Sequence, residues 1–75
     1  MAITVYSTTM CPYCNMVKDY LRTKNISFTD INVEKDRVKA IEMIRKSGQQ
    51  GVPVIDINGK IIVGFDKARI DQAIR

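Results

Sequence analysis

The sequence predicts an α/β fold in the order β-α-β-α-β-β-α, with a mixed four-stranded sheet and helices on its faces. Three observations predict it. Short β-branched runs alternate with segments of helical periodicity along the whole chain. The first β-α-β unit needs a crossover connection, which makes its two strands parallel. Asn58-Gly59 between two apolar runs is a strong type I′ hairpin signal, so the last two strands are antiparallel.

The first strand is expected at residues 3–6, because β-branched and aromatic residues alternate there. A helix should follow over residues 12–24. Pro12 suits its first position, where a missing N–H costs nothing, and the residue before a proline is extended, so Cys11 fits the N-cap. Asn25 is a plausible left-handed stop. The expected buried face of this helix carries Val17, Tyr20 and Leu21.

The middle of the chain predicts a second strand and a second helix. Residues 26–33 form the strand, whose alternation slips once near Asp30, which indicates a bulge or a strand end there. The helix should cover residues 36–46 and end at Gly48. Its apolar residues recur at a spacing of three, which predicts a core-facing stripe of Val38, Ile41 and Ile44.

The last third of the chain predicts a hairpin followed by a helix. The hairpin strands are expected at residues 54–57 and 61–63. Asp66 should cap the helix, and Phe65 and Ile70 have the spacing of a hydrophobic staple. The residues that this helix should bury are Ile70, Ala73 and Ile74.

Length and charge limit the function. A chain of 75 residues fits one domain, covering residues 1–75. Its 12 Lys and Arg against 8 Asp and Glu give a net charge of +4 that is dispersed rather than clustered, so we expect no nucleic-acid partner. No apolar run is long enough to span a membrane, and residues 1–6 do not resemble a signal peptide. We therefore expect a cytoplasmic protein with no membrane partner.

The chemistry is expected at Cys11-Pro12-Tyr13-Cys14, which follows a strand and opens a helix. A helix N-terminus exposes unpaired N–H groups and carries partial positive charge, which stabilises a thiolate. Cys11, at the exposed tip, is the expected nucleophile. Cys14 lies one turn further on the same face and is the expected resolving cysteine, so the two should form a redox disulfide.

The sequence supports two other uses of the cysteines less well. A structural disulfide would close a loop of four residues and restrain the unfolded chain little. A zinc site needs four ligands, and the chain has two cysteines and no histidine, so we expect no metal site within it. Zinc or an iron–sulfur cluster would need ligands from a second chain or an outside thiol.

Three segments resemble the glutaredoxins. Cys-Pro-Tyr-Cys at residues 11–14 matches the commonest glutaredoxin active site, residues 51–54 look like the family's T-V-P segment, and residues 64–66 look like the glycine turn before its last helix. They occur in the family's order and cover essentially the whole chain. The resemblance implies the thioredoxin fold in its minimal glutaredoxin form and a thiol–disulfide oxidoreductase of cell redox homeostasis. The resemblance further implies that this oxidoreductase reduces protein or glutathione mixed disulfides with glutathione as electron donor.

The resemblance also implies a binding site. Pro53 should be cis and face Cys11, the backbone of Val52 should pair with a bound thiol peptide, and Tyr13 should pack beside the glutathione tripeptide. Glutathione is then a co-substrate, with no bound cofactor, and the chain is expected to be monomeric. The residues expected to contact substrate or glutathione are Tyr13, Gln50, Val52, Pro53, Gly64 and Asp66.

Two departures from the family pattern keep alternatives open. Thr8 stands where many glutaredoxins have a glutathione-binding lysine, and Phe65 follows Gly64 directly, so that Asp66 is interpreted first as a helix cap. The short turn resembles the glutaredoxin-like redoxins, which serve ribonucleotide reductase and take electrons from thioredoxin reductase. A dimer sharing an iron–sulfur cluster is a third alternative.

Overall fold

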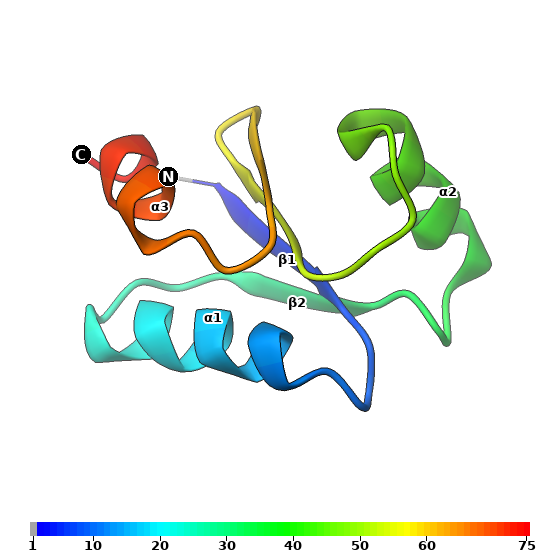
Figure 1. The fold of residues 1–75 in the computed structure, drawn as a ribbon, viewed down its shortest axis with the longest axis horizontal. Helices are drawn as coiled ribbons and strands as arrows, with labels where there is room; N and C mark the ends of the chain where they lie inside the picture. Colours follow the sequence, from blue (N-terminus) through cyan, green and yellow to red (C-terminus); the bar gives the residue numbers. More distant parts are fainter. Residues whose placement is uncertain (1) are drawn as a thin grey trace.

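The structure, a computed structural model, describes residues 2–75 (Figure 1). Met1, the first residue of the predicted domain and of residues 1–6 discussed above, lies outside the described residues. The elements follow the predicted order: β1 (Ile3–Ser7), α1 (Pro12–Thr23), β2 (Thr29–Asn32), α2 (Arg37–Ser47), β3 (Val54–Ile57), β4 (Lys60–Val63) and α3 (Lys67–Ala73).

The sheet has the strand order β2-β1-β3-β4. β1 pairs with β2 in parallel, with Thr4 opposite Thr29. It also pairs with β3 antiparallel, and β3 forms the predicted hairpin with β4. β1 is therefore a central strand, and its carboxyl end delivers the chain from the middle of the sheet to the cysteines.

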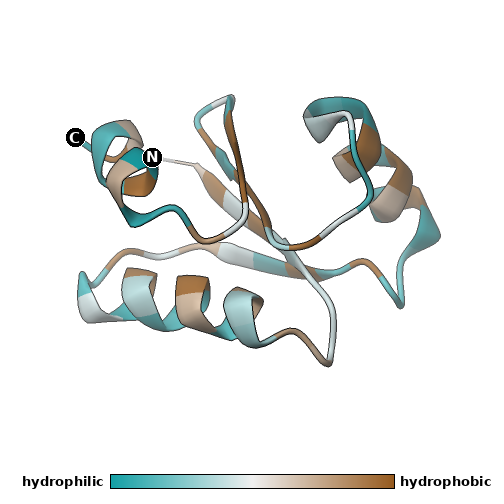
Figure 2. Cartoon of the chain, viewed as in Figure 1, coloured by the Kyte–Doolittle hydropathy of each residue, from teal (hydrophilic) through white to brown (hydrophobic). Residues whose placement is uncertain are grey.

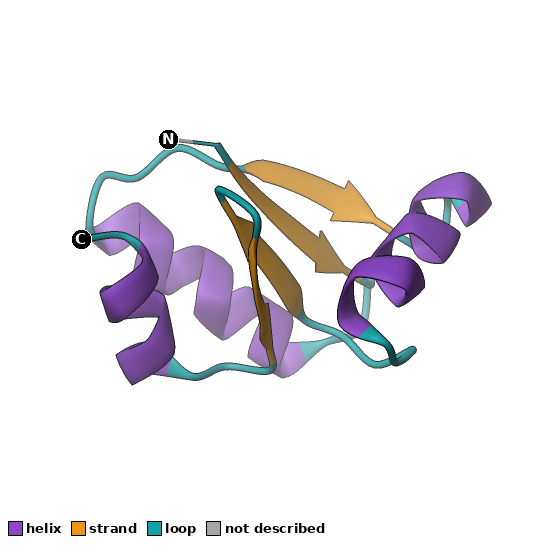
Figure 3. Cartoon of the chain, turned by 90° about the horizontal axis from the view of Figure 1, so that it is seen from above, coloured by secondary structure: helices purple, strands orange, loops and turns teal. Residues whose placement is uncertain are grey.

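The sheet separates two apolar clusters because successive side chains of a strand point to opposite faces. In Figure 3, α1 and α3 lie on one side of the sheet and α2 on the other. The larger cluster joins α1 and α3 to the sheet through Ile3, Val5, Val17, Leu21, Ile55, Ile57, Ile62 and Ile70. The smaller cluster lies under α2 and consists of Tyr6, Met43 and Val54.

α1 begins and ends where the sequence predicts. Cys11 is its N-cap, with extended backbone at φ −140° and ψ 97°, and Pro12 opens the first turn. Asn25 has a left-handed φ of 58°, and the N–H of Ile26 returns to the carbonyl of Leu21 at 3.0 Å. This local bonding turns the chain back towards the sheet.

β2 is shorter than predicted. It begins at Thr29, and its register with β1 runs without a bulge from Thr29 to Asn32. Ile26 and Phe28 precede the strand, yet both pack against the larger core cluster. Both residues belong to the loop that covers the core before β2 begins. The slip in the alternation therefore marks an end of the strand rather than a bulge.

The predicted core-facing stripe of α2 is wrong. Val38 is 74% exposed and Ile41 46% exposed, whereas Met43 is 2% exposed. Figure 2 shows hydrophobic residues on α2 among hydrophilic ones, so the pattern alone leaves the rotation of the helix ambiguous. Polar contacts with the sheet, made by Glu42 and Lys46, fix the rotation that turns Met43 inwards.

Those contacts form a charged network between α2 and the sheet. Lys46 donates hydrogen bonds to the Tyr6 hydroxyl and to the Asp56 carboxylate, both at 2.8 Å, and the Tyr6 hydroxyl donates to Glu42. Burial raises the pKa of Asp56, but hydrogen bonds from Lys46 and the Gly59 N–H outweigh it and leave the pKa below its usual value. The bond from Tyr6 likewise holds the pKa of Glu42 below its usual value.

Acid should therefore weaken the fold. A carboxyl whose pKa is lower in the folded than in the unfolded chain stabilises the fold above its unfolded pKa of about 4, and that contribution is lost as the pH falls through the folded pKa. We expect the urea midpoint to be flat between about pH 5 and 7 and to fall below about pH 4. Asp56→Asn should make that fall shallower, and an equal fall in both proteins would contradict the assignment to Asp56.

The hairpin and α3 agree with the predictions. Asn58 and Gly59 both have positive φ, at 51° and 92°, as a type I′ turn requires. Asp66 caps α3 by accepting from the Arg69 N–H at 3.1 Å. Phe65 packs edge-to-face on Tyr20, with ring centroids 6.1 Å apart, which ties α3 to α1.

Among residues 2–75, no helix is long and apolar enough to cross a membrane.

Candidate functional site

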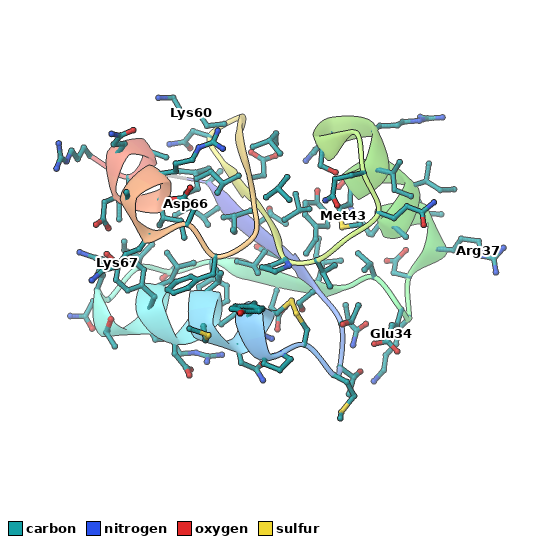
Figure 4. All side chains as sticks on the ribbon, viewed as in Figure 1. Glu34, Arg37, Met43, Lys60, Asp66 and Lys67 are labelled. Atoms are coloured by element: carbon teal, nitrogen blue, oxygen red, sulfur yellow. A yellow bond between two sulfur atoms is a disulfide. The ribbon has the colours of Figure 1, made fainter. Side chains whose placement is uncertain are left out.

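The two cysteines lie where the central strand passes into the first helix. β1 ends at Ser7, a loop covers residues 8–10, and Cys11 occupies the N-cap of α1. Cys11 and Cys14 are joined by a disulfide, with Cα atoms 5.2 Å apart. Figure 4 draws this disulfide as a yellow bond beside the first turn of α1. The disulfide that the sequence predicted is thus present in the structure.

The helix start supplies the electrostatics that a thiolate needs. The Cys14 N–H donates to the Cys11 sulfur at 3.1 Å, so the sulfur takes the place of the oxygen in an ordinary N-cap. Within the described helix, the first turn contains no acidic side chain that would oppose a negative sulfur. A reduced Cys11 sulfur in this position would be stabilised as the thiolate by this N–H and by the helix dipole.

The two cysteine residues differ slightly in exposure. Cys14 is fully buried at 0% exposure, and Cys11 is 8% exposed. The expectation that Cys11 is openly exposed is therefore wrong for the disulfide form, because its sulfur is bonded to the buried Cys14. Cys11 is still the more exposed of the two residues, and its role as the nucleophile stays a prediction.

A second segment of the predicted site is the loop before β3. The Val52–Pro53 peptide bond is cis, as expected. The Pro53 carbonyl accepts from the Gly64 N–H at 2.9 Å, so the structure brings these two predicted residues together. Val52 is half-buried and packs against the smaller core cluster.

Gln49, outside the predicted site, shapes the same loop. Its amide oxygen accepts from the Gly51 N–H at 2.7 Å, and its amide nitrogen donates to the Gly51 carbonyl at 2.9 Å. These two hydrogen bonds to the backbone of one residue fix the turn that leads into Pro53. Sequence reasoning selected Gln50 instead, which is exposed.

The remaining predicted residues lie at the surface. Tyr13 is 62% exposed on the first turn of α1. Asp66 is occupied as the cap of α3, which supports its interpretation as a helix cap; Figure 4 labels it near the start of that helix. Within the described residues, the side chains of Tyr13 and Asp66 form no hydrogen bond with either cysteine.

Sequence reasoning also missed a set of contacts behind the active-site loop. Asn32 is the last residue of β2, and Glu34 follows the strand. Their side chains form hydrogen bonds with Thr9, which is 23 residues from Asn32 and 25 residues from Glu34 in the sequence. The one local signal was Asn32 itself, whose side chain accepts from the Glu34 N–H in a turn of the kind that asparagine favours.

Metal binding gains no support from this arrangement. Among residues 2–75, no group of three or more His, Cys, Asp or Glu side chains gathers in a way that would hold a metal ion.

A disulfide at the first helix of a four-stranded mixed sheet, together with a cis-proline in the loop before β3, defines a thiol–disulfide redox protein with the thioredoxin fold. Comparison with known proteins names the family. The glutaredoxin family model matches residues 3–62, so the chain belongs to the glutaredoxin family.

Individual relatives agree with this assignment. The chain is 54% identical over 72 residues to an uncharacterised glutaredoxin-like 8.6 kDa protein in the rubredoxin operon of Clostridium pasteurianum, covering 96% of each. It is 36% identical over 64 residues to glutaredoxin 3 of Escherichia coli K12, covering 85% of this chain and 77% of the relative. The solved structure of the glutaredoxin-like NrdH-redoxin of Escherichia coli superposes with a TM-score of 0.84 at 28% identity, covering 96% of this chain and 93% of the other.

Proposed function

We propose that the protein is a glutathione-dependent glutaredoxin that reduces protein disulfides and glutathione mixed disulfides. The observation that carries this proposal is the position of the Cys11 sulfur, which caps α1 and accepts the Cys14 N–H at 3.1 Å. A cysteine held in this way is ready to attack as a thiolate at neutral pH. The cytoplasm, where glutathione keeps thiols reduced, is the compartment that suits this chemistry.

The proposed reaction begins at Cys11. Its thiolate attacks the glutathione sulfur of a mixed disulfide, the S–S bond breaks, and the released protein thiolate takes up a proton. Cys11 then carries glutathione. A second glutathione thiolate attacks that mixed disulfide, releases oxidised glutathione and restores the Cys11 thiolate.

Protein disulfides follow the two-cysteine route. Cys11 forms a mixed disulfide with the substrate, and Cys14 attacks Cys11 to release the reduced substrate and leave the intramolecular disulfide seen in the structure. Two glutathione molecules reduce this disulfide in turn. The exposed ring of Tyr13 and the backbone of Val52, beside the cis-proline, are proposed to hold the glutathione peptide, with Gln50, Pro53, Gly64 and Asp66 around them.

A second candidate has its own support. Thr8 lacks the positive charge that would bind a glutathione carboxylate, and the chain spans 93% of the NrdH-redoxin structure against 77% of glutaredoxin 3. That NrdH-redoxin has a thioredoxin-like activity profile. On this alternative, thioredoxin reductase reduces the Cys11–Cys14 disulfide, and ribonucleotide reductase is the receiver.

Turnover with two reductants separates the candidates. The protein is given a glutathione mixed disulfide together with glutathione and glutathione reductase, and in parallel with thioredoxin reductase and NADPH. We expect turnover with glutathione at least about tenfold faster. Faster turnover with thioredoxin reductase would overturn the glutathione assignment and favour the redoxin.

A further inference from the structure

The loop before Cys11 is hydrogen-bonded to the end of β2 and to the turn that follows it. The carboxylate of Glu34 accepts from the Thr9 N–H at 2.8 Å, and the Asn32 amide donates to the Thr9 hydroxyl at 3.0 Å. Figure 4 shows Glu34 beside the blue loop between β1 and α1. Thr9 is thus held through both its backbone and its side chain by residues far away in sequence.

The two side chains that hold Thr9 are themselves fixed. The Asn32 side-chain oxygen accepts from the Glu34 N–H at 2.9 Å, so one side chain bridges both loops. The Val33 N–H donates to the Ser7 carbonyl at 2.9 Å, which continues the pairing of β2 with β1 to the start of the active-site loop. These two hydrogen bonds connect the holding residues to the end of the β1–β2 pairing.

Beyond Thr9, the chain is held again at Cys11, whose carbonyl accepts from the Asn15 N–H at 3.2 Å and whose sulfur is bonded to Cys14. Met10, between Thr9 and Cys11, is 89% exposed and packs against no core cluster. Cys11 must nevertheless keep its extended backbone, at φ −140° and ψ 97°, for its sulfur to receive the Cys14 N–H. A loop that moves at Thr9 would move the cysteine away from this bond, since two peptide units separate them.

We propose that Asn32 and Glu34 are positioning residues that latch Thr9 and so hold Cys11 at the N-cap of α1 for its reaction with disulfides. The inference deepens the proposed function and rests on the proposed role of Cys11 as nucleophile. Neither residue touches the sulfur in the structure; each acts through Thr9.

The charge of Glu34 and its position have opposite effects, which makes the latch testable. A nearby carboxylate disfavours a thiolate and raises its pKa, whereas the latch favours the thiolate by keeping Cys11 at the helix start. Glu34→Gln removes the charge and keeps an oxygen that accepts from Thr9. Glu34→Ala removes both.

The first measurement is the pH dependence of alkylation of reduced Cys11 by iodoacetamide, in a Cys14→Ser background. Glu34→Ala and Asn32→Ala should raise the apparent thiol pKa by about half a unit to one unit, which means roughly three- to tenfold slower alkylation below that pKa. Glu34→Gln should leave the pKa unchanged or lower it slightly. Asp19→Asn, at a side chain 73% exposed on α1, is the charge-matched control and should behave as the parent.

The second measurement is amide hydrogen exchange at Thr9. The N–H should be protected in the parent and in Glu34→Gln and unprotected in Glu34→Ala. An unprotected Thr9 N–H in the parent would overturn the latch. So would equal shifts of the Cys11 pKa in Glu34→Ala and Glu34→Gln, because the carboxylate would then act by charge alone.

Failure of the latch is distinguishable from failure of the proposed function. Alkylation and exchange need no turnover and no reductant enzyme. A parent protein without turnover of any disulfide would overturn the function and leave both measurements valid for the latch.

Discussion

Cys11→Ser is expected to abolish turnover of both protein disulfides and glutathione mixed disulfides, by a factor on the order of a thousand or more, since the attacking thiolate is gone. A serine hydroxyl at this N-cap would still accept the Cys14 N–H, so α1 should form and the fold should persist. The loss should appear in a coupled assay of NADPH consumption, with far-ultraviolet circular dichroism unchanged. Substantial activity in this variant would overturn the assignment of Cys11 as nucleophile.

Cys14→Ser is the matched control, because it removes the other sulfur of the same disulfide. It should retain the removal of glutathione from mixed disulfides, where a second glutathione resolves the intermediate. It should lose most reduction of protein disulfides, where Cys14 is the proposed resolving thiol. Loss of both reactions in Cys14→Ser would mean that the two-cysteine route is obligatory.

Met43→Ala is expected to have the largest effect on stability among substitutions in α2. Met43 is 2% exposed and packs with Tyr6 and Val54, so its truncation leaves a cavity that costs about 2–5 kcal/mol. A domain of this size has a total free energy of unfolding of only about 5 kcal/mol. Urea unfolding followed by circular dichroism should show most of that stability lost.

Ile41→Ala tests the same helix at the position that periodicity wrongly assigned to the core. Ile41 is 46% exposed, so we expect a change within about 0.5 kcal/mol. If Met43→Ala fails to fold, Met43→Leu should fold with a loss below about 1.5 kcal/mol, because it keeps the side-chain volume. A larger loss from Ile41→Ala than from Met43→Ala would mean that α2 turns a different face to the sheet.

The parts of the fold that the sequence predicts best are those with local causes. The N-cap at Cys11, the left-handed Asn25 and the Asn58-Gly59 turn depend on residues within one turn of each other, so the pattern contains the answer. The rotation of α2 does not. Its polar contacts with Tyr6 and Asp56 join residues that only the folded sheet brings together.

The site divides in the same way. The disulfide was predicted from the C-x-x-C spacing after a strand and at a helix start, and the cis-proline from the resemblance of residues 51–54 to the glutaredoxin segment. The bonds from Asn32 and Glu34 to Thr9 were not, since each side chain alone resembles an ordinary surface residue. Their pairing depends on the parallel register of β2 with β1, which brings Asn32 level with Ser7.

The full burial of Cys14 has a consequence for how substrates bind at the site. On the proposed mechanism, every partner, whether tripeptide or protein, would be linked to Cys11 rather than to Cys14. If the protein uses glutathione as proposed, glutathione and protein substrates would compete for attachment to the Cys11 sulfur. The cellular glutathione concentration would then set both the rate at which the protein is reduced and the extent to which glutathione excludes protein substrates from Cys11.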